Sequence, residues 1–323
     1  MKKIIFRMIT LIIIFSILIA PTTLGQEENV KKHSIDKDFK NHSLYLDLSG
    51  NLYSWGYNYY GQLGDGSYTN CTTPKKIMDN VKAFSSGGNH TLALKNDGTL
   101  WAWGSNTSAQ LGDGSYKNST TPKKIMDNVA FISAGGNHSL AIKTDGTLWV
   151  WGSNSFAQLG DGSYNNSTTP KKIMDNVASI SAGGNHSLAI KADGTLWTWG
   201  SNSFAQIGDG TYKNNTNPKK IMDNVTSISA GGNHSLAIKA DSTLWTWGSN
   251  SFAQIGDNSY RNSTTPKKII LIEPDINIIK DPSKSIIPNE IKSLDNNEFN
   301  IYLINETLLK TMKTILLQIR IFI

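Results

Sequence analysis

GGNHSLAIKADGTLWTWGSNSFAQIGDG occupies residues 183–210, and close variants of this stretch occur five times along the 323-residue chain. Three markers repeat at intervals of 48 residues, without an insertion or a deletion. They are a histidine, the tryptophan of a Trp-Gly pair and a proline: His42, His90, His138, His186 and His234; Trp55, Trp103, Trp151, Trp199 and Trp247; Pro74, Pro122, Pro170, Pro218 and Pro266. A fixed period of this length is typical of a repeat protein in which each copy forms one structural unit.

Each copy carries the pattern of four short strands. In residues 138–200, HSLAIK alternates between its two faces, and the Asp-Gly pair that follows is a strong hairpin signal. The next run, TLWVWG, places Trp149 and Trp151 two residues apart and therefore on the same face of a strand. Pro170 opens PKKIM, which fits an edge strand because proline has no N–H to donate. VASISAG then supplies a fourth alternating strand.

Burial of the tryptophans predicts how the copies are arranged. Each Trp ring has roughly 150–250 Å² to bury, which a solitary four-stranded sheet cannot cover. Stacking each sheet on the next buries the rings, so the sequence predicts an all-β fold, a β-propeller of four-stranded blades. A solenoid of stacked sheets is the alternative. The predicted blade core contains these residues: Trp55, Trp101, Trp103, Trp149, Trp151, Trp197, Trp199, Trp245, Trp247, His90, His138, His186 and His234.

The repeat resembles that of the regulator of chromosome condensation family over about residues 42–272. The resemblance lies in GGNHSLAIK, in DGTLWTWG and above all in WGYNYYGQLGDGS at residues 55–67. It implies a β-propeller with one blade per repeat. The chain departs from the family pattern in two respects. The glycine before the Gln-Leu-Gly turn is kept only in the first copy, as Gly61, and is alanine in the four later copies. The last copy also loses turn glycines. The family usually has seven blades and only five are legible here, so a closed ring and an open, incomplete array are both compatible with the sequence.

The two ends of the chain do not carry the repeat. Residues 1–25 combine basic residues, an apolar run and a small or polar stretch, which predicts a signal peptide and a secreted or cell-surface protein. An uncleaved membrane anchor is the alternative. Residues 26–41 are an N-terminal lead-in whose sequence does not match a complete first strand. Residues 42–281 are the predicted five-repeat propeller.

Residues 282–323 form a C-terminal tail without an assigned fold. Its apolar residues could line one face of a helix: Leu308, Leu309, Met312, Leu316 and Ile319. The favoured interpretation is the decayed or truncated end of a longer array, and the alternative is a segment that covers an open propeller edge.

Charge and cysteine content exclude several classes of function. The formal net charge is +6, and three of the positive charges belong to the predicted signal peptide. The remainder has no basic stripe that could follow a phosphate backbone, so no nucleic-acid partner is expected. Arginine occurs only at positions 7, 261 and 320, which disfavours bidentate recognition of phosphate. Cys71 is the only cysteine, so no intramolecular disulfide can form.

The repeated polar residues do not make a catalytic or metal-binding set. One histidine per blade, with no second His or Cys nearby, gives no ligand set. The simpler interpretation is an imidazole that satisfies backbone groups within its own blade. Each GDG loop offers a single aspartate, where a calcium loop needs several oxygen ligands. No nucleophile, base and orienting residue occur together. We therefore expect no enzyme activity, no cofactor and no metal.

Aromatic residues in the loops are the candidate partner-binding residues. They are Tyr68, Tyr116, Tyr164, Tyr212 and Tyr260, with Phe156, Phe204 and Phe252 in an earlier part of the loop. Exposed aromatic side chains make good interface anchors, but these rings could equally pack between blades.

The sequence predicts an exported, noncatalytic propeller that binds an extracellular or surface protein through its repeated loops. The family resemblance also implies guanine-nucleotide exchange on a nuclear GTPase, chromatin binding, ultraviolet sensing or inhibition of secreted enzymes. The first two need a nuclear address, which a signal peptide contradicts. Carbohydrate binding on aromatic platforms is the main alternative, and an exchange factor is the second.

Overall fold

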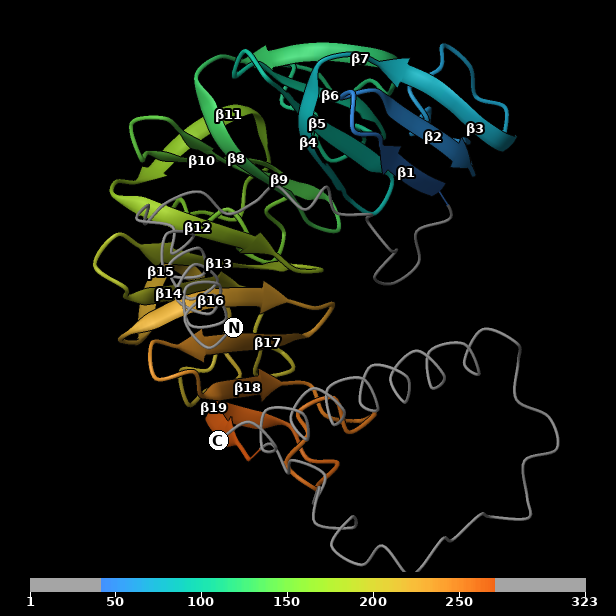
Figure 1. The fold of residues 1–323 in the computed structure, drawn as a ribbon. Helices are drawn as coiled ribbons and strands as arrows, with labels where there is room; N and C mark the ends of the chain where they lie inside the picture. Colours follow the sequence, from blue (N-terminus) through green and yellow to red (C-terminus); the bar gives the residue numbers. More distant parts are fainter. Residues whose placement is uncertain (1–41, 271–323) are drawn as a thin grey trace, which may run out of the picture. The chain divides into compact units, whose positions relative to one another are not determined.

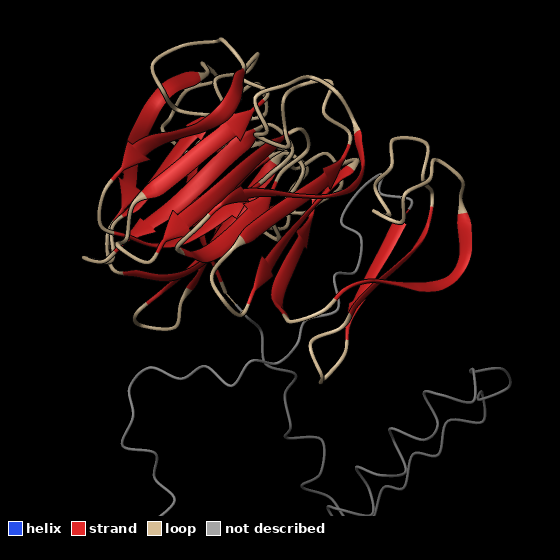
Figure 2. Cartoon of the chain, turned by 90° about the horizontal axis from the view of Figure 1, so that it is seen from above, coloured by secondary structure: helices blue, strands red, loops and turns tan. Residues whose placement is uncertain are grey.

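A computed structural model describes residues 42–270. The predicted signal peptide, lead-in and C-terminal tail lie outside the described residues. Within 42–270 the regular structure consists of β-strands joined by loops, as Figure 2 shows. The same range contains no helix that could cross a membrane. The prediction of an all-β fold is confirmed.

Within residues 42–270, nineteen strands form five antiparallel sheets that follow one another in chain order. The first sheet has three strands, β1 (His42–Leu46), β2 (Leu52–Gly56) and β3 (Cys71–Met78). The second has four, β4 (Val81–Ser86), β5 (His90–Lys95), β6 (Leu100–Gly104) and β7 (Ser119–Met126). The third is β8 (Val129–Ala134), β9 (His138–Lys143), β10 (Leu148–Gly152) and β11 (Ser167–Met174). The fourth is β12 (Val177–Ala182), β13 (His186–Lys191), β14 (Leu196–Gly200) and β15 (Asn215–Met222), and the fifth is β16 (Val225–Ala230), β17 (His234–Lys239), β18 (Leu244–Gly248) and β19 (Ser263–Ile269).

The five sheets form a propeller-type array that is not closed. Figure 1 shows them in an arc, from the blue strands β1–β3 to the orange strand β19, and the first and last sheets do not meet. Each sheet is one blade, as the repeat predicts. The strand that contains the repeated proline lies at the edge of its sheet in every blade, where a missing N–H donor costs least.

The structure divides the chain into blades at a different point from the one at which the sequence repeat was divided into copies. A copy written from His138 to residue 185 ends with the strand VASISA, but this strand, β12, pairs with β13 of the following copy. A blade therefore runs from Val177 to Met222. The Asp-Asn turn before β12 connects two blades, with Asn176 in the left-handed region at φ 60°. With this frame the first sheet has three strands among residues 42–270, and the position of an opening strand falls before the described residues.

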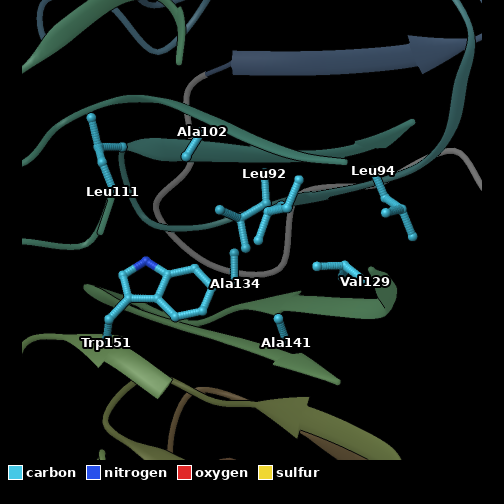
Figure 3. Packing of buried hydrophobic residues seen from close by; sticks show 9 residues of the cluster. Leu92, Leu94, Ala102, Leu111, Val129, Ala134, Ala141 and Trp151 are labelled. Atoms are coloured by element: carbon cyan, nitrogen blue, oxygen red, sulfur yellow. The ribbon is translucent and has the colours of Figure 1, made fainter. Parts of the chain in front are cut away.

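Each blade from the second to the fifth buries the tryptophan of its Trp-Gly pair against the preceding blade. In Figure 3, Trp151 and Ala141 of the third blade pack against Leu92 and Leu111 of the second blade. The four equivalent indoles are completely buried, namely Trp103, Trp151, Trp199 and Trp247. Burial of one such side chain contributes about 3 kcal/mol or more, so the interfaces between blades supply much of the stability of the array.

The other tryptophans of the repeat lie at the border of the core. Trp101, Trp149, Trp197 and Trp245 are only half-buried. The indole Nε1 of Trp149 donates to Thr147 Oγ1 at 2.9 Å, and Lys143 Nζ lies 4.7 Å from the ring centroid. Trp55 is also half-buried, because no described sheet precedes its own. The sequence placed all nine tryptophans in the blade core, and for these five the structure shows a partly solvated position.

The glycine pair before each histidine allows neighbouring blades to touch. The Gly136 N–H lies 3.2 Å from the carbonyl oxygens of Gly183 and Gly184 in the next blade. A Cβ atom on Gly136 would come within 2.5 Å of the Gly184 oxygen, and one on Gly135 within 2.2 Å of the His138 ring. Both positions therefore exclude any side chain, which explains why Gly-Gly recurs there.

Candidate interaction surface

The longest loop of each blade follows its Trp-Gly strand and precedes its edge strand. We call these the rim loops: residues 57–70, 105–118, 153–166, 201–214 and 249–262. Each of the first four rim loops is linked to the edge strand of the next blade: Gly114 N–H, for example, donates to Thr168 O in β11 and Gly162 N–H to Thr216 O in β15, both at 2.8 Å. Thr168 and Thr216 each lie just after the rim loop of the next blade. The five loops therefore form a row along one side of the array.

A buried asparagine holds each rim loop in shape. The backbone N–H of Asn154 donates to Asn166 Oδ1 at 2.8 Å, and its own Oδ1 accepts from the N–H of Leu159 at 2.9 Å. Its Nδ2 donates to Asp161 Oδ1 and to Ser163 O, both at 3.0 Å. Equivalent asparagines, all completely buried, are Asn58, Asn106, Asn202 and Asn250.

Asn154→Ala should lower the free energy of unfolding by about 2–3 kcal/mol, since it leaves the Leu159 N–H buried without its acceptor. Denaturant unfolding of the full chain measures this loss. Asn165→Ala, at an exposed position in the same loop, is the matched control and should cost less than about 0.5 kcal/mol. Equal effects of the two substitutions would show that the buried asparagine does not organise the loop.

The aspartate of each GDG turn is an internal hydrogen-bond acceptor. Asp161 Oδ1 accepts from Ser163 N–H at 3.1 Å and from Ser163 Oγ at 2.8 Å, and Lys171 Nζ lies 2.8 Å from Oδ2. Burial raises the pKa of this carboxyl, but the bonds from Lys171 and Ser163 outweigh burial and lower its pKa overall. For the equivalent Asp209 the pKa falls to about 2 by the same balance. Turn chemistry accounts for these residues, and within 42–270 no three His, Cys, Asp or Glu side chains are grouped so that they could hold a metal ion.

The repeated histidine joins two blades. His138 Nε2 lies 3.0 Å from Ser187 Oγ of the next blade, and Ser187 Oγ donates to Gln158 O at 2.8 Å. Because the hydroxyl proton goes to the carbonyl, Nε2 carries the proton in the bond to the serine. Trp199 Nε1 donates to the same Gln158 oxygen at 2.9 Å. The expected bonding to backbone groups within its own blade is therefore wrong: the imidazole reaches a side chain 49 residues further on.

The loop tyrosines project into solvent. Their exposed fractions are 56% for Tyr68, 54% for Tyr116, 53% for Tyr164, 53% for Tyr212 and 75% for Tyr260. The loop phenylalanines differ with their place in the array: Phe156 and Phe204 are 44% and 43% exposed, whereas Phe252, in the last described blade, is 88% exposed, so the two that a further blade follows are partly covered. The sequence left two interpretations open for these aromatic residues, exposure at the surface and packing between blades. The tyrosines are exposed, and the phenylalanines are partly exposed and partly covered.

A family model described as RCC1-like domain matches residues 23–283. This chain belongs to the RCC1-like domain family. The resemblance of the 48-residue repeat to the regulator of chromosome condensation family is confirmed, and with it the expectation of one propeller blade per repeat. No curated protein sequence matches the chain.

Solved structures place this RCC1-like domain among known propellers. Yeast RCC1, Prp20, solved with Kap60 bound, is 26% identical with a TM-score of 0.65, and covers 72% of this chain and 60% of its own. Prp20p from Saccharomyces cerevisiae, in a study of its binding to Gsp1p and histones, is 25% identical with a TM-score of 0.64 and covers 72% and 62%. Human WBSCR16 has 23% identity, a TM-score of 0.65 and coverage of 72% and 65%, and supports the fold alone. The chain thus spans 60–65% of the length of these structures.

The first RCC1-like blade carries a tyrosine cluster that the sequence analysis did not single out. Tyr57 and Tyr59 are stacked with ring centroids 6.4 Å apart, and Tyr60 meets the ring of Tyr59 edge-on at 5.1 Å. Tyr59 is 67% exposed. The later copies have serine or threonine at the positions of Tyr57 and Tyr59. This departure from an otherwise strict repeat was the available signal.

Proposed function

We propose that this RCC1-like chain is a noncatalytic protein-binding module that is exported and captures its partner with the row of rim loops. A propeller of this family is a scaffold for protein interaction, and here the scaffold repeats one aromatic loop in five successive blades. The proposal of export rests on residues 1–25, whose basic start and apolar run are typical of a signal peptide.

The exposure of the five loop tyrosines is the observation that carries the proposal. A tyrosine in a rigid loop supplies a large amphipathic contact area at low entropic cost, and Tyr, Ser, Gly and Asn are the residues that antibody loops use for the same purpose. The rim loop GSNSFAQLGDGSYNN at residues 152–166 has this composition. Its buried asparagine and paired aspartate hold the backbone in one conformation, which lowers the cost of ordering the loop on binding.

The residue after each loop tyrosine varies between copies and is exposed: Thr69, Lys117, Asn165, Lys213 and Arg261. The tyrosines thus provide a constant contact and the following residues a blade-specific one. Such a row suits a partner that spans several blades and reads their differences by charge.

Affinity capture with the full chain tests the proposal. Immobilised chain should retain a defined partner from culture medium or surface extracts, and the double substitution Tyr164→Ala and Tyr212→Ala should reduce retention at least tenfold, because each ring is an anchor of the interface. Lys82→Ala, at an exposed position on β4 outside the rim loops, is the control for nonspecific effects. Undiminished capture by a folded double variant would refute the assignment of the loops.

Two other functions are candidates. Similarity to Prp20p, which has been studied for its binding to Gsp1p and histones, favours a small GTPase as partner. Faster nucleotide release from such a GTPase in the presence of the chain would support this function. The exposed aromatic platforms favour carbohydrate binding. If the chain bound a glycan on an array and the tyrosine substitutions abolished this binding, the partner of the rim loops would be a glycan and not a protein.

A further inference from the structure

The rim loop of the first blade carries a cluster of three tyrosines, Tyr57, Tyr59 and Tyr60, that the other blades do not share. The four later blades have serine at the position of Tyr57, and serine or threonine at that of Tyr59. The bond that closes the first loop, from Gly61 N–H to Asn58 O at 2.9 Å, nevertheless has an equivalent in every later loop. The fold of the loop therefore does not require these rings, and they indicate a role particular to the first blade.

The three rings stand as two nearly parallel walls and a third wall that is nearly perpendicular to them. The planes of Tyr57 and Tyr59 differ by 14°, with centroids 6.4 Å apart. The plane of Tyr60 makes angles of 71° with Tyr57 and 84° with Tyr59, and its centroid lies 6.4 and 5.1 Å from theirs. Tyr59 is exposed, so the cluster is accessible from solvent.

The backbone beneath the rings is held by bonds within the loop. The completely buried Asn58 accepts from Leu63 N–H at 2.9 Å, and its own N–H donates to Asn70 Oδ1 at 2.8 Å. The N–H of Tyr60 donates to Gln62 Oε1 at 2.9 Å. The tyrosines are thus presented by an ordered loop, which lowers the entropic cost of binding a ligand.

The arrangement of the rings suits a cation. The face of a tyrosine ring attracts positive charge within about 6 Å of its centroid. Since no two of the three centroids are more than 6.4 Å apart, a cation seated above the middle of the cluster lies within this range of all three rings. The same fold pairs rings with cations elsewhere, as between Lys143 Nζ and the ring of Trp149. Among residues 42–270, the lysines placed over a ring all face tryptophans and not these tyrosines.

We propose that the tyrosine cluster of the first blade binds a quaternary ammonium group, as in choline. The only carboxylate of this rim loop belongs to Asp65, whose Oδ1 accepts from Ser67 Oγ at 2.8 Å and whose Oδ2 lies 2.9 Å from Lys75 Nζ. A primary ammonium has three N–H donors that must be satisfied when it leaves water, and no carboxylate of the loop is left for it. A quaternary ammonium has no N–H and is the cation that cages of aromatic rings recognise. This site does not depend on the capture of a protein by the row of rim loops.

Isothermal titration of the full chain with choline and with its neutral carbon analogue tests the chemistry of the site. In the analogue a tert-butyl group replaces the trimethylammonium group, so the shape is kept and the charge is lost. Choline should bind at one site, and the analogue at least tenfold more weakly, because only the charge is attracted by the ring faces. Absence of choline binding, or equal affinity of the two compounds, overturns the proposal.

Substitution of Tyr59 tests the ring itself. Tyr59→Ser should weaken choline binding about fivefold or more, and it should leave the fold intact because the last three blades have serine at this position. Tyr59→Phe keeps the ring face and should bind choline like the parent chain. Tyr59→Leu is apolar but has no ring, so it should behave like Tyr59→Ser. Loss of binding in the phenylalanine variant, or full binding in the leucine variant, contradicts recognition by the ring faces.

Vesicles distinguish two sources of the choline group. If the chain sediments with phosphatidylcholine vesicles and not with phosphatidylglycerol vesicles, the ligand is a lipid headgroup. If choline binds but the vesicles do not, the ligand is a free choline compound, and the site is supported in both cases. Failure of the rim-loop proposal has a different signature, because Tyr212 substitution then leaves partner capture intact, whereas failure of this proposal is seen in choline binding and at Tyr59.

Discussion

Gly112→Ala should destabilise the chain by about 3 kcal/mol or more. A Cβ atom at this position would lie 2.7 Å from both Cδ1 and Nε1 of Trp151, which is completely buried in the next blade. The indole cannot move aside without losing the bond from Nε1 to Gln110 O, 2.9 Å long. Overpacking of this kind typically costs 1–3 kcal/mol, and the left-handed backbone of Gly112, φ +76°, adds about 1 kcal/mol for any other residue.

Gly114→Ala separates the two contributions. Gly114 has nearly the same backbone conformation, φ +81°, but a Cβ atom there would meet nothing within 4 Å. Gly114→Ala should therefore lower the free energy of unfolding only by the cost of the left-handed backbone conformation, about 1 kcal/mol. Denaturant unfolding of both variants, followed by tryptophan fluorescence, gives the comparison. If the two losses are equal, the close contact between the Gln-Leu-Gly turn and the next tryptophan does not contribute to the stability of the array.

The fold could be predicted from the sequence because its decisive features are local and are repeated. A hairpin signal at Asp145-Gly146 fixes the pairing of β9 with β10, and the proline at position 170 fixes the edge strand. The blade frame could not be predicted this way. β12 pairs with β13 through the short turn at residues 183–185, but a 48-residue period is the same wherever a copy is taken to begin, so the period does not show at which strand a blade starts.

The candidate site was predictable in its residues but not in its packing. The recurring loop tyrosines mark a surface, yet only the structure gives the exposed fractions, 53% for Tyr164 and 44% for Phe156. The backbone conformation of the alanines that replace the family glycine could not be predicted from the residue type: Ala157 lies in the left-handed region at φ 64°. There the surrounding bonds, such as Ala157 N–H to Asn154 O at 2.8 Å, override the intrinsic preference of alanine.

The buried histidines should make the array unstable in mild acid. Burial lowers the pKa of His138 to about 4, and burial together with the neighbouring His138 and His234 lowers the pKa of His186 to about 3. In the unfolded chain both imidazoles have a pKa of about 6.5. Below pH 6.5 the two imidazoles are therefore protonated in the unfolded state but stay neutral in the folded state. The free energy of unfolding falls as the pH falls. Above pH 7 the two residues contribute no pH dependence.

Between pH 6.5 and pH 4.5 the two histidines together should cost about 5 kcal/mol of stability, since each pH unit is worth about 1.4 kcal/mol per group. The aspartates add little to this slope, because their lowered pKa values place most of the stability that they lose below about pH 4.5. Denaturant unfolding of the full chain at several pH values measures the slope, and the double substitution His138→Gln and His186→Gln, which keeps an N–H donor for the serine of the next blade, should remove most of it. An unchanged slope in the double variant would mean that these two imidazoles accept protons in the folded state, and the bond from His138 to Ser187 would then not require a neutral ring.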